Sequence, residues 1–181
     1  RERVEPLHIA DDSDGTITER DALHLIVAAY GSSDLWDRIE PRIVSGQVSI
    51  EQAMQEEFAS VRATPDQVRE LVLREAGMRR GFREFARWAR ERDHRLIVFS
   101  SGFRSVIDDI LAHWGIEGLE IESHEALFSA DGCRLVWSDR GELCAECGRH
   151  CKRHDLRGHS RGERLVYIGD GISDRCGARM A

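Results

Sequence analysis

The chain has 181 residues and a formal net charge of −7, with an isoelectric point near 5.6 and a mean hydropathy of −0.44. Its 41% of hydrophobic residues excludes a disordered chain, and the acidic balance argues against binding nucleic acid through the phosphate backbone. No apolar run approaches the ~20 residues of a membrane-spanning helix, and no secretory leader opens the sequence. We therefore expect a cytoplasmic globular protein with no membrane or nucleic-acid partner.

Apolar runs of two kinds alternate along the chain. Strands are predicted over 7–10, 96–99, 119–121 and 165–168, with a hairpin over 128–137 that turns at Asp131-Gly132. Helices are predicted over 23–30, 49–61, 64–77, 82–91 and 106–114, from apolar residues at helical spacing and from capping signals such as Ser49 and Thr64. Strands that are apolar on both faces and separated by helices predict an α/β fold, in which a Rossmann-like parallel sheet is covered on each side.

The long stretch from 19 to 77 contributes helices and no strand. We therefore predict that residues 1–18 and 78–181 form the core domain and that 19–77 form a helical cap inserted over the sheet. Three large side chains of this stretch are expected to pack inside it, namely Tyr30, Trp36 and Phe58. Glu19 is either a first-turn helix residue, favoured by the helix dipole, or a contact for a substrate amine.

Three of the predicted strands end in polar clusters, which are Asp12/Asp14, Ser100/Ser101 and Asp170/Asp174. Because ligands bind at the carboxyl edge of a parallel sheet, we expect these clusters to share one site. Converging carboxylates repel one another unless a hard cation neutralises them, and Mg²⁺ prefers oxygen ligands. If Gly15 lets the chain turn sharply, one of Asp12 and Asp14 can act as nucleophile and the other as general acid and base.

The same edge offers groups that bind an anion. They are the Ser100 hydroxyl, the backbone N–H groups of Ser101 and Gly102, and the ammonium of Lys152, the single lysine beside 25 arginines. From frequency alone, Lys152 could equally be one more solvated charge. A nucleophile, a metal and a cation around a shared phosphate are the groups that phosphoryl transfer requires.

Four segments resemble, in order, the four motifs of the haloacid dehalogenase (HAD) superfamily: Asp12-Ser13-Asp14-Gly15-Thr16, the strand ending in Ser100, Lys152, and Gly169-Asp170-Gly171-Ile172-Ser173-Asp174. The helical insertion resembles the C1-type cap of that family. The phrases Gly81-Phe82-Arg83-Glu84-Phe85, Phe99-Ser100-Ser101-Gly102-Phe103 and Cys151-Lys152 are similar to the phosphoserine phosphatase-like branch, especially the methionine-salvage phosphatases of the MtnX type.

This resemblance implies a Mg²⁺-dependent phosphatase that acts on a small phosphorylated metabolite. Asp12 would form an aspartyl-phosphate, and Asp14 would protonate the leaving group, activate water and offer its backbone carbonyl to the metal. The implied phosphate-binding residues are Ser100, Ser101, Gly102 and Lys152. The implied metal ligands are Asp12, Asp14, Asp170 and Asp174.

Other functions stay open at this point. Phosphoserine is the alternative substrate, and a phosphomutase would keep the phosphoryl group instead of giving it to water. Asp11 and Ser13 depart from the family pattern and motivate a third alternative, a non-catalytic metal-binding relative. An unpaired buried Asp11 would be costly, so we expect it to pair with an arginine or to face solvent or the metal, unless it is a harmless polar substitution.

Two features lie outside the four motifs. Cys144, Cys147 and Cys151 have a spacing that could hold a structural Zn²⁺, and a zinc-organised interaction domain is one function this would allow. The alternative is reduced thiols on a loop that presents Lys152. The family continues past its fourth motif with a further strand and helix, whereas this chain stops at Ala181. We therefore expect a piece of a longer protein, or an association such as a homodimer that covers the sheet edge.

Overall fold

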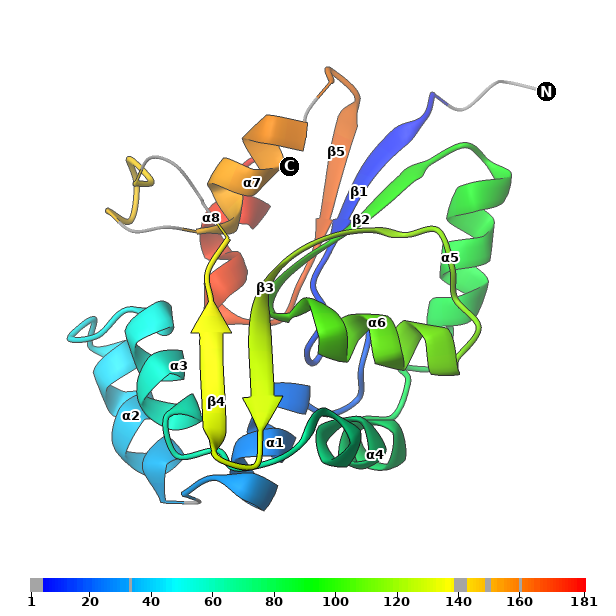
Figure 1. Cartoon of the computed structure of the whole chain (residues 1–181). Helices are drawn as coiled ribbons and strands as arrows, with labels where there is room; N and C mark the ends of the chain where they lie inside the picture. Colours follow the sequence, from blue (N-terminus) through cyan, green and yellow to red (C-terminus); the bar gives the residue numbers. More distant parts are fainter. Residues whose placement is uncertain (1–4, 33, 139–142, 149–150, 160) are drawn as a thin grey trace.

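A computed structural model describes residues 5–32, 34–138, 143–148, 151–159 and 161–181 and shows a five-stranded sheet flanked by helices (Figure 1). The strands are β1 (Leu7–Asp11), β2 (Arg95–Phe103), β3 (Glu120–Ser129), β4 (Gly132–Val136) and β5 (Arg164–Ile168). Their order is β4-β3-β2-β1-β5, and only the β3–β4 pair is antiparallel. The predicted α/β class is therefore confirmed.

The helices fall into two groups along the chain. Those between β1 and β2 are α1 (Ala22–Tyr30), α2 (Leu35–Val44), α3 (Ile50–Phe58), α4 (Pro65–Glu75) and α5 (Phe82–Glu91). Those after β2 are α6 (Arg104–His113), α7 (Lys152–His159), the 3₁₀ turn η1 (Ile172–Asp174) and α8 (Arg175–Ala178). Within the described residues, none of these helices has the length and apolar character that crossing a bilayer requires.

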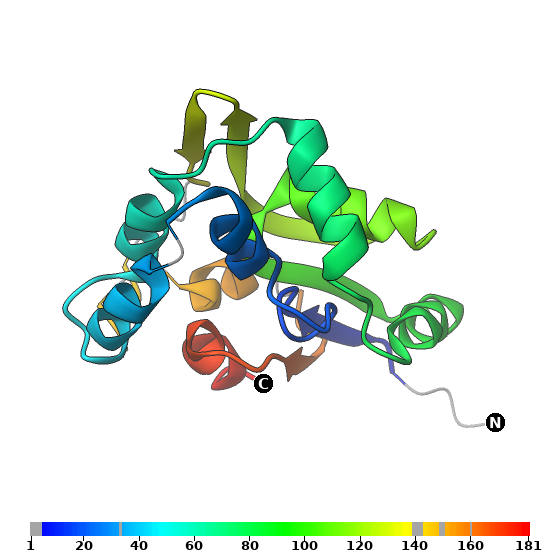
Figure 2. The same ribbon diagram turned by 90° about the horizontal axis from the view of Figure 1, so that it is seen from below.

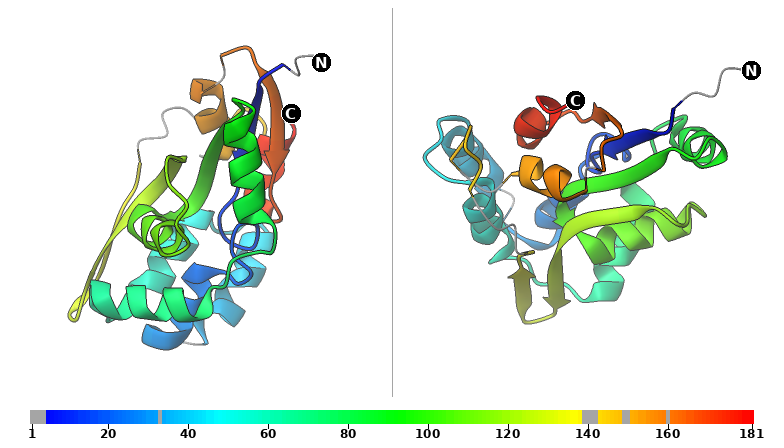
Figure 3. Two further views of the ribbon diagram at one scale, coloured as in Figure 1. Left: turned by 90° about the vertical axis from the view of Figure 1, so that its right-hand side faces the viewer. Right: turned by 90° about the horizontal axis from the view of Figure 1, so that it is seen from above.

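The central strands are apolar on both faces because helices cover both. Ile9 of β1 packs with Ala89 of α5 on one face, and its neighbour Ala10 packs with Leu156 of α7 on the other. The view from above in Figure 3 shows α5 and α6 on one side of the sheet and α7 and α8 on the opposite side. Period-two alternation of side chains thus places every second residue of a strand against a different helix layer.

Two helix starts follow from local capping chemistry. The Ser49 hydroxyl accepts from the backbone N–H of Gln52 at 3.1 Å, and the Gln52 side chain accepts from the N–H of Ser49 at 2.9 Å. Thr64 and Gln67 make the same reciprocal pair at the start of α4. These capping boxes satisfy N–H groups that would otherwise lack partners, and both are confirmed.

The structure corrects several of the predicted elements. The short strand at 119–121 and the hairpin at 128–137 are joined, because β3 runs unbroken from Glu120 to Ser129 before pairing with β4. Helix α2 was missed, since it contains Pro41, a residue that normally ends a helix. Its buried Ile39 packs with Val48 and Ala53, and this contact anchors the helix.

Helices α1 to α4 lie at the end of the sheet toward which β1 and β5 run (Figure 1), and Figure 2 shows this end from below. Three aromatic rings join these helices to the sheet. Phe58 of α3 meets Phe103 of β2 edge-on with ring centroids 4.8 Å apart, and Phe128 of β3 lies 6.0 Å from Phe103. Burial of such rings is worth several kcal/mol in total, so this contact fixes the helices over the strand ends.

Replacing Phe58 with alanine should lower the free energy of unfolding by about 3–5 kcal/mol, because the ring is buried and the cavity left behind cannot refill. Urea denaturation followed by circular dichroism measures the change. Leu127→Ala, next to Phe128 on β3, is the control, since half of the Leu127 side chain is exposed, and it should cost less than about 1 kcal/mol. Equal losses in the two variants would contradict this packing.

Candidate active site

The turn after β1 depends on a glycine. Gly15 has a φ of 78°, a backbone conformation that favours glycine, and the N–H groups of the next three residues donate to the carbonyl of Ser13. A Cβ atom at Gly15 would lie 2.2 Å from Oδ2 of Asp170. The sharp turn expected from the sequence is present, and the absence of a side chain there lets the first and fourth motifs approach each other.

Three carboxylates converge at this edge of the sheet. Asp12, Asp170 and Asp174 each offer one oxygen, and these oxygens all lie within 4.8 Å of one another. Asp12 and Asp174 are buried whereas Asp170 is exposed, and the Thr16 hydroxyl donates to Asp170 Oδ1 at 3.3 Å. An oxygen-only donor set of this kind, open to solvent on one side, has the chemistry that Mg²⁺ prefers.

Lys152 lies at the centre of the site. It is the first residue of α7, and only 1% of its surface is exposed. Its Nζ lies 2.7 Å from Asp12 Oδ1 and 2.7 Å from Asp174 Oδ1. A buried ammonium is costly without opposite charges beside it, so these two carboxylates are what allow it to be here.

Asp174 holds this ammonium in place through a full set of contacts. Its Oδ1 also accepts from the Tyr167 hydroxyl at 2.6 Å, and its Oδ2 accepts from the N–H of Gly171 at 2.9 Å. Burial acts to raise the pKa of Asp174, but Lys152 and these donors bring it below its ordinary value. For Asp12 burial outweighs Lys152 and raises the pKa to about 6.

The Asp14 carboxyl group has different surroundings from Asp12. Its Oδ1 accepts from the N–H of Ala22, the first residue of α1, at 2.9 Å. Burial, together with the charge of nearby Asp21, raises the pKa of Asp14 to about 8. Its pKa is thus raised further than that of Asp12, the direction that suits Asp14 to donate a proton while Asp12 attacks.

The end of β2 supplies the second polar cluster. The Ser100 hydroxyl oxygen accepts from the N–H of Gly102 at 2.9 Å, and both residues lie close to Asp14. A Cβ atom on Gly102 would come within 3.0 Å of Asp14 Oδ2. Ser101 and Gly102 line the same cavity as Asp12 and Asp14. The structure thus brings together the strand ends that the sequence pointed to, while the role of each residue stays a prediction.

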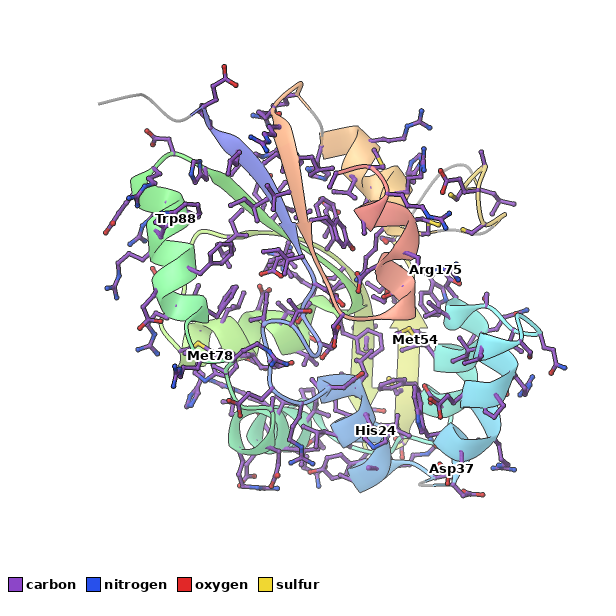
Figure 4. The ribbon with its side chains drawn as sticks, turned by 180° about the vertical axis from the view of Figure 1, so that it is seen from behind. His24, Asp37, Met54, Met78, Trp88 and Arg175 are labelled. Atoms are coloured by element: carbon purple, nitrogen blue, oxygen red, sulfur yellow. The ribbon has the colours of Figure 1, made fainter. Side chains whose placement is uncertain are left out.

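A cavity of about 430 Å³ lies between the strand ends and helices α1 to α3. Its apolar wall includes Leu23, Val27, Trp36, Ile43 and Met54. Trp36, predicted to be a core residue, instead borders this cavity, and its ring meets that of His24 edge-on at 5.8 Å. Figure 4 shows where His24 on α1 and Met54 on α3 lie relative to the strand ends. Helices α1 to α3 therefore form the cavity wall that faces the carboxylates.

The polar part of the cavity wall is acidic. Asp21, Glu40 and Glu57 line it together with the carboxylates at the strand ends, and among the described lining residues none is an arginine or lysine. Burial, with the nearby charge of Asp21, raises the pKa of Glu57 to about 7. No sequence pattern pointed to Glu57, because a glutamate inside an amphipathic helix normally faces solvent.

Asp11 does not behave as expected. It is buried, no hydrogen-bond partner is found for its Oδ1, and no arginine pairs with it among the described residues. Burial and the neighbouring Asp12 raise its pKa to about 7. Glu19 is exposed and lies before α1 begins, so it is not a first-turn helix residue.

Tyr167 is the contact that sequence reasoning missed. It lies in β5, a strand read from its apolar residues alone, and its register partner on β1 is Ala10. Its side chain therefore shares the face of the sheet that α7 covers, where its hydroxyl reaches Asp174. The sequence does contain one signal for this contact, which is a single tyrosine in an otherwise aliphatic strand. A buried tyrosine hydroxyl usually has a hydrogen-bond partner.

Comparison with known proteins agrees with this arrangement. The family model described as haloacid dehalogenase-like hydrolase matches residues 10–179. A 2-hydroxy-3-keto-5-methylthiopentenyl-1-phosphate phosphatase of Brevibacillus brevis is 30% identical, over 94% of this chain and 78% of that protein. The human phosphoserine phosphatase is 23% identical, over 90% of this chain and 73% of that protein.

Solved structures show the same fold. A structure titled as a phospho-aspartyl intermediate analogue of phosphoserine phosphatase superposes with a TM-score of 0.73 at 19% sequence identity. The superposition covers 98% of this chain and 83% of that one. At this identity the likeness concerns the fold alone.

The buried Glu57 should make stability depend on pH. Its pKa is raised from 4.5 to about 7, so the wild-type protein loses stability as the pH rises from 4.5 through 7, where only the unfolded state ionises freely. Glu57→Gln removes the ionisable group and therefore this loss. The free energy of unfolding of Glu57→Gln, relative to that of wild type, should be about 1–2 kcal/mol higher at pH 8 than at pH 5.

Urea denaturation of both proteins at the two pH values measures this difference. Glu56→Gln is the matched control, because Glu56 is exposed and paired with Arg42 at 2.7 Å; it should change stability by less than about 1 kcal/mol at either pH. A Glu57→Gln effect that is the same at pH 5 and pH 8 would show that the carboxyl group is not perturbed.

Proposed function

The chain belongs to the haloacid dehalogenase-like hydrolase family, and from this premise we propose that it is a Mg²⁺-dependent phosphatase that hydrolyses a small phosphorylated metabolite through Asp12. The observation that carries the proposal is the buried contact of Lys152 with Asp174 and with Asp12, the carboxylate that lines the cavity. This contact fixes one carboxylate as nucleophile and leaves a cation beside it for the phosphoryl oxygens.

The residues present fit a divalent cation. Asp12, Asp170 and Asp174 would hold it, with Asp174 acting mainly through its contacts with Lys152 and Tyr167. The backbone carbonyl of Asp14 is the remaining ligand in the prediction, since its carboxylate is engaged by α1. When bound, Mg²⁺ would neutralise charge on the phosphoryl oxygens and so favour attack by an anion.

The contacts of Asp12 distinguish its two oxygens. Both the N–H of Ser13, at 2.8 Å, and Nζ of Lys152, at 2.7 Å, bind Oδ1. We assign Oδ2 as the attacking atom for this reason. It forms a bond to phosphorus while the bond from phosphorus to the ester oxygen breaks, and Asp14 donates its proton to the departing alkoxide.

Hydrolysis of the aspartyl-phosphate then restores the enzyme. Asp14, now ionised, accepts a proton from water as the water oxygen attacks phosphorus, and the bond between phosphorus and Asp12 breaks to release phosphate. The Ser100 hydroxyl, the N–H groups at the end of β2 and the Lys152 ammonium would bind the phosphoryl oxygens throughout. Transfer to water, and not back to the substrate, distinguishes this proposal from a phosphomutase.

The cavity wall favours one substrate class over another. Apolar side chains such as Val27, Trp36 and Met54 suit an uncharged organic tail. A substrate with a carboxylate, such as phosphoserine, would meet Asp21 and Glu57 without an arginine or lysine among the described lining residues. We therefore favour a ketone or enol phosphate like that named for the Brevibacillus brevis relative, with phosphoserine as the second candidate because several relatives carry that name.

Asp12→Asn should lower phosphate release by more than about a thousandfold, because it removes the nucleophile. The assay measures inorganic phosphate from a panel of phosphomonoesters with Mg²⁺ present and after chelation. Asp11→Asn is the matched control, since it makes the same chemical change one residue earlier without lining the cavity; it should keep activity within about threefold. Equal background release from wild type and Asp12→Asn would favour the non-catalytic alternative.

The apolar wall should also set substrate preference. We expect kcat/KM for an alkyl or methylthioalkyl ketone phosphate to exceed that for phosphoserine by at least about tenfold, because the carboxylate of phosphoserine would be buried next to like charges. Steady-state kinetics on both compounds measures the ratio. A preference for phosphoserine would show that the cavity binds the substrate in a different way.

A further inference from the structure

Four of the five cysteines, which the proposed hydrolysis does not use, gather into one cluster. They are Cys144, Cys147, Cys151 and Cys176, and their sulfur atoms all lie within 4.8 Å of one another. The first three were a candidate zinc site in the sequence. Cys176 was not included because it lies in α8, beyond strand β5, and only the fold brings it to the others.

The local backbone conformation positions two of these thiols, Cys144 and Cys147. Gly148, with a φ of 68°, donates its N–H to the carbonyl of Cys144 at 2.8 Å. This closes a tight turn and sets Cys144 and Cys147 side by side. The N–H groups of Cys147 and Glu146 are directed at the Cys144 sulfur. Such N–H groups stabilise a thiolate, the form in which cysteine binds metals.

The separations and charges fit one tetrahedral ion. With Zn–S bonds of about 2.3 Å, sulfurs at the corners of a tetrahedron are about 3.8 Å apart, inside the observed limit of 4.8 Å. Zinc with four thiolates carries two negative charges. Arg153 and Arg179 both pair with Glu146, and Arg175 lines the same cavity as Cys147, so three arginines and one glutamate supply two positive charges around the cluster.

We propose that these four cysteines bind one structural Zn²⁺ ion. Thiolate ligands select zinc over Mg²⁺, and four protein ligands leave no open position for substrate, as is typical of structural sites. This site is therefore distinct from the carboxylate cluster, both in its ligands and in its chemistry.

The position of the cluster gives the ion a role in the active site. Cys151 directly precedes Lys152, and Cys176 follows Asp174 by two residues. The ion would tie the start of α7 to α8 immediately behind the Lys152–Asp174 contact. Figure 4 shows Arg175 on α8 opposite Met54 on α3, and both residues line the cavity that Cys147 and Cys176 also border. Zinc binding would thereby fix one wall next to the substrate cavity.

The test is metal analysis of the whole chain purified under reducing conditions without chelator. We expect one zinc per chain, and replacement by Co²⁺ should give the visible absorption of a tetrahedral thiolate site. Cys176→Ser should lose most of the zinc. Cys133→Ser is the matched control, because Cys133 lies in β4 and is not part of the cluster, and it should keep the full equivalent.

Two further measurements do not depend on how the variants fold. In denaturant without reductant, the apoprotein should show five reactive thiols, one for each cysteine. A count of one reactive thiol would mean that the four clustered cysteines form two disulfides, and it would overturn the proposal. A zinc chelator should lower the Tm of the wild-type protein by more than about 5 °C.

The proposal would also be overturned if the purified chain contained no zinc and the reduced chain did not take up zinc in competition with a chelator. The absorption of an iron–sulfur cluster would overturn it as well. Phosphate release with Mg²⁺ is assayed separately, so failure of the zinc site does not count against the proposed hydrolysis.

Discussion

The site depends on one buried interaction, the ammonium of Lys152 held between Asp12 and Asp174. Burying any one of these three charges alone would cost free energy, and the opposite charges beside it offset that cost. The lysine must come from α7 and the second aspartate from η1, so the interaction also fixes how two separate segments meet the end of β1. The sheet places the strand ends next to one another, and the helices packed on both faces stabilise the sheet.

Much of the fold could be predicted because it follows from local rules. Both faces of β1 and β2 are covered, so these strands read as apolar runs, and reciprocal caps such as Ser49 with Gln52 mark helix starts directly. Helix α2 could not be found in this way. Its stability comes from packing of Ile39 against Val48 and Ala53, and this tertiary contact outweighs the unfavourable Pro41.

The candidate site shows the same division. Asp12, Asp170 and Lys152 stand in recognisable motifs, so their meeting could be predicted from chain order and from the parallel sheet. Tyr167 and Glu57 carry no such pattern. Their importance arises from burial beside particular neighbours, Asp174 in one case and Asp21 in the other, and burial of a single polar residue is a property of the folded chain that no local spacing encodes.

The burial of Lys152 has a practical consequence for chemical labelling. It is the sole lysine in a sequence with 25 arginines, so the side chains of the folded protein offer acylating reagents no other primary amine. Because that amine is 1% exposed and held by two carboxylates, its acylation requires the strand ends and α7 to separate. The rate of lysine modification in this protein would therefore report the opening of one defined contact, without the background from surface amines that obscures such measurements in most proteins.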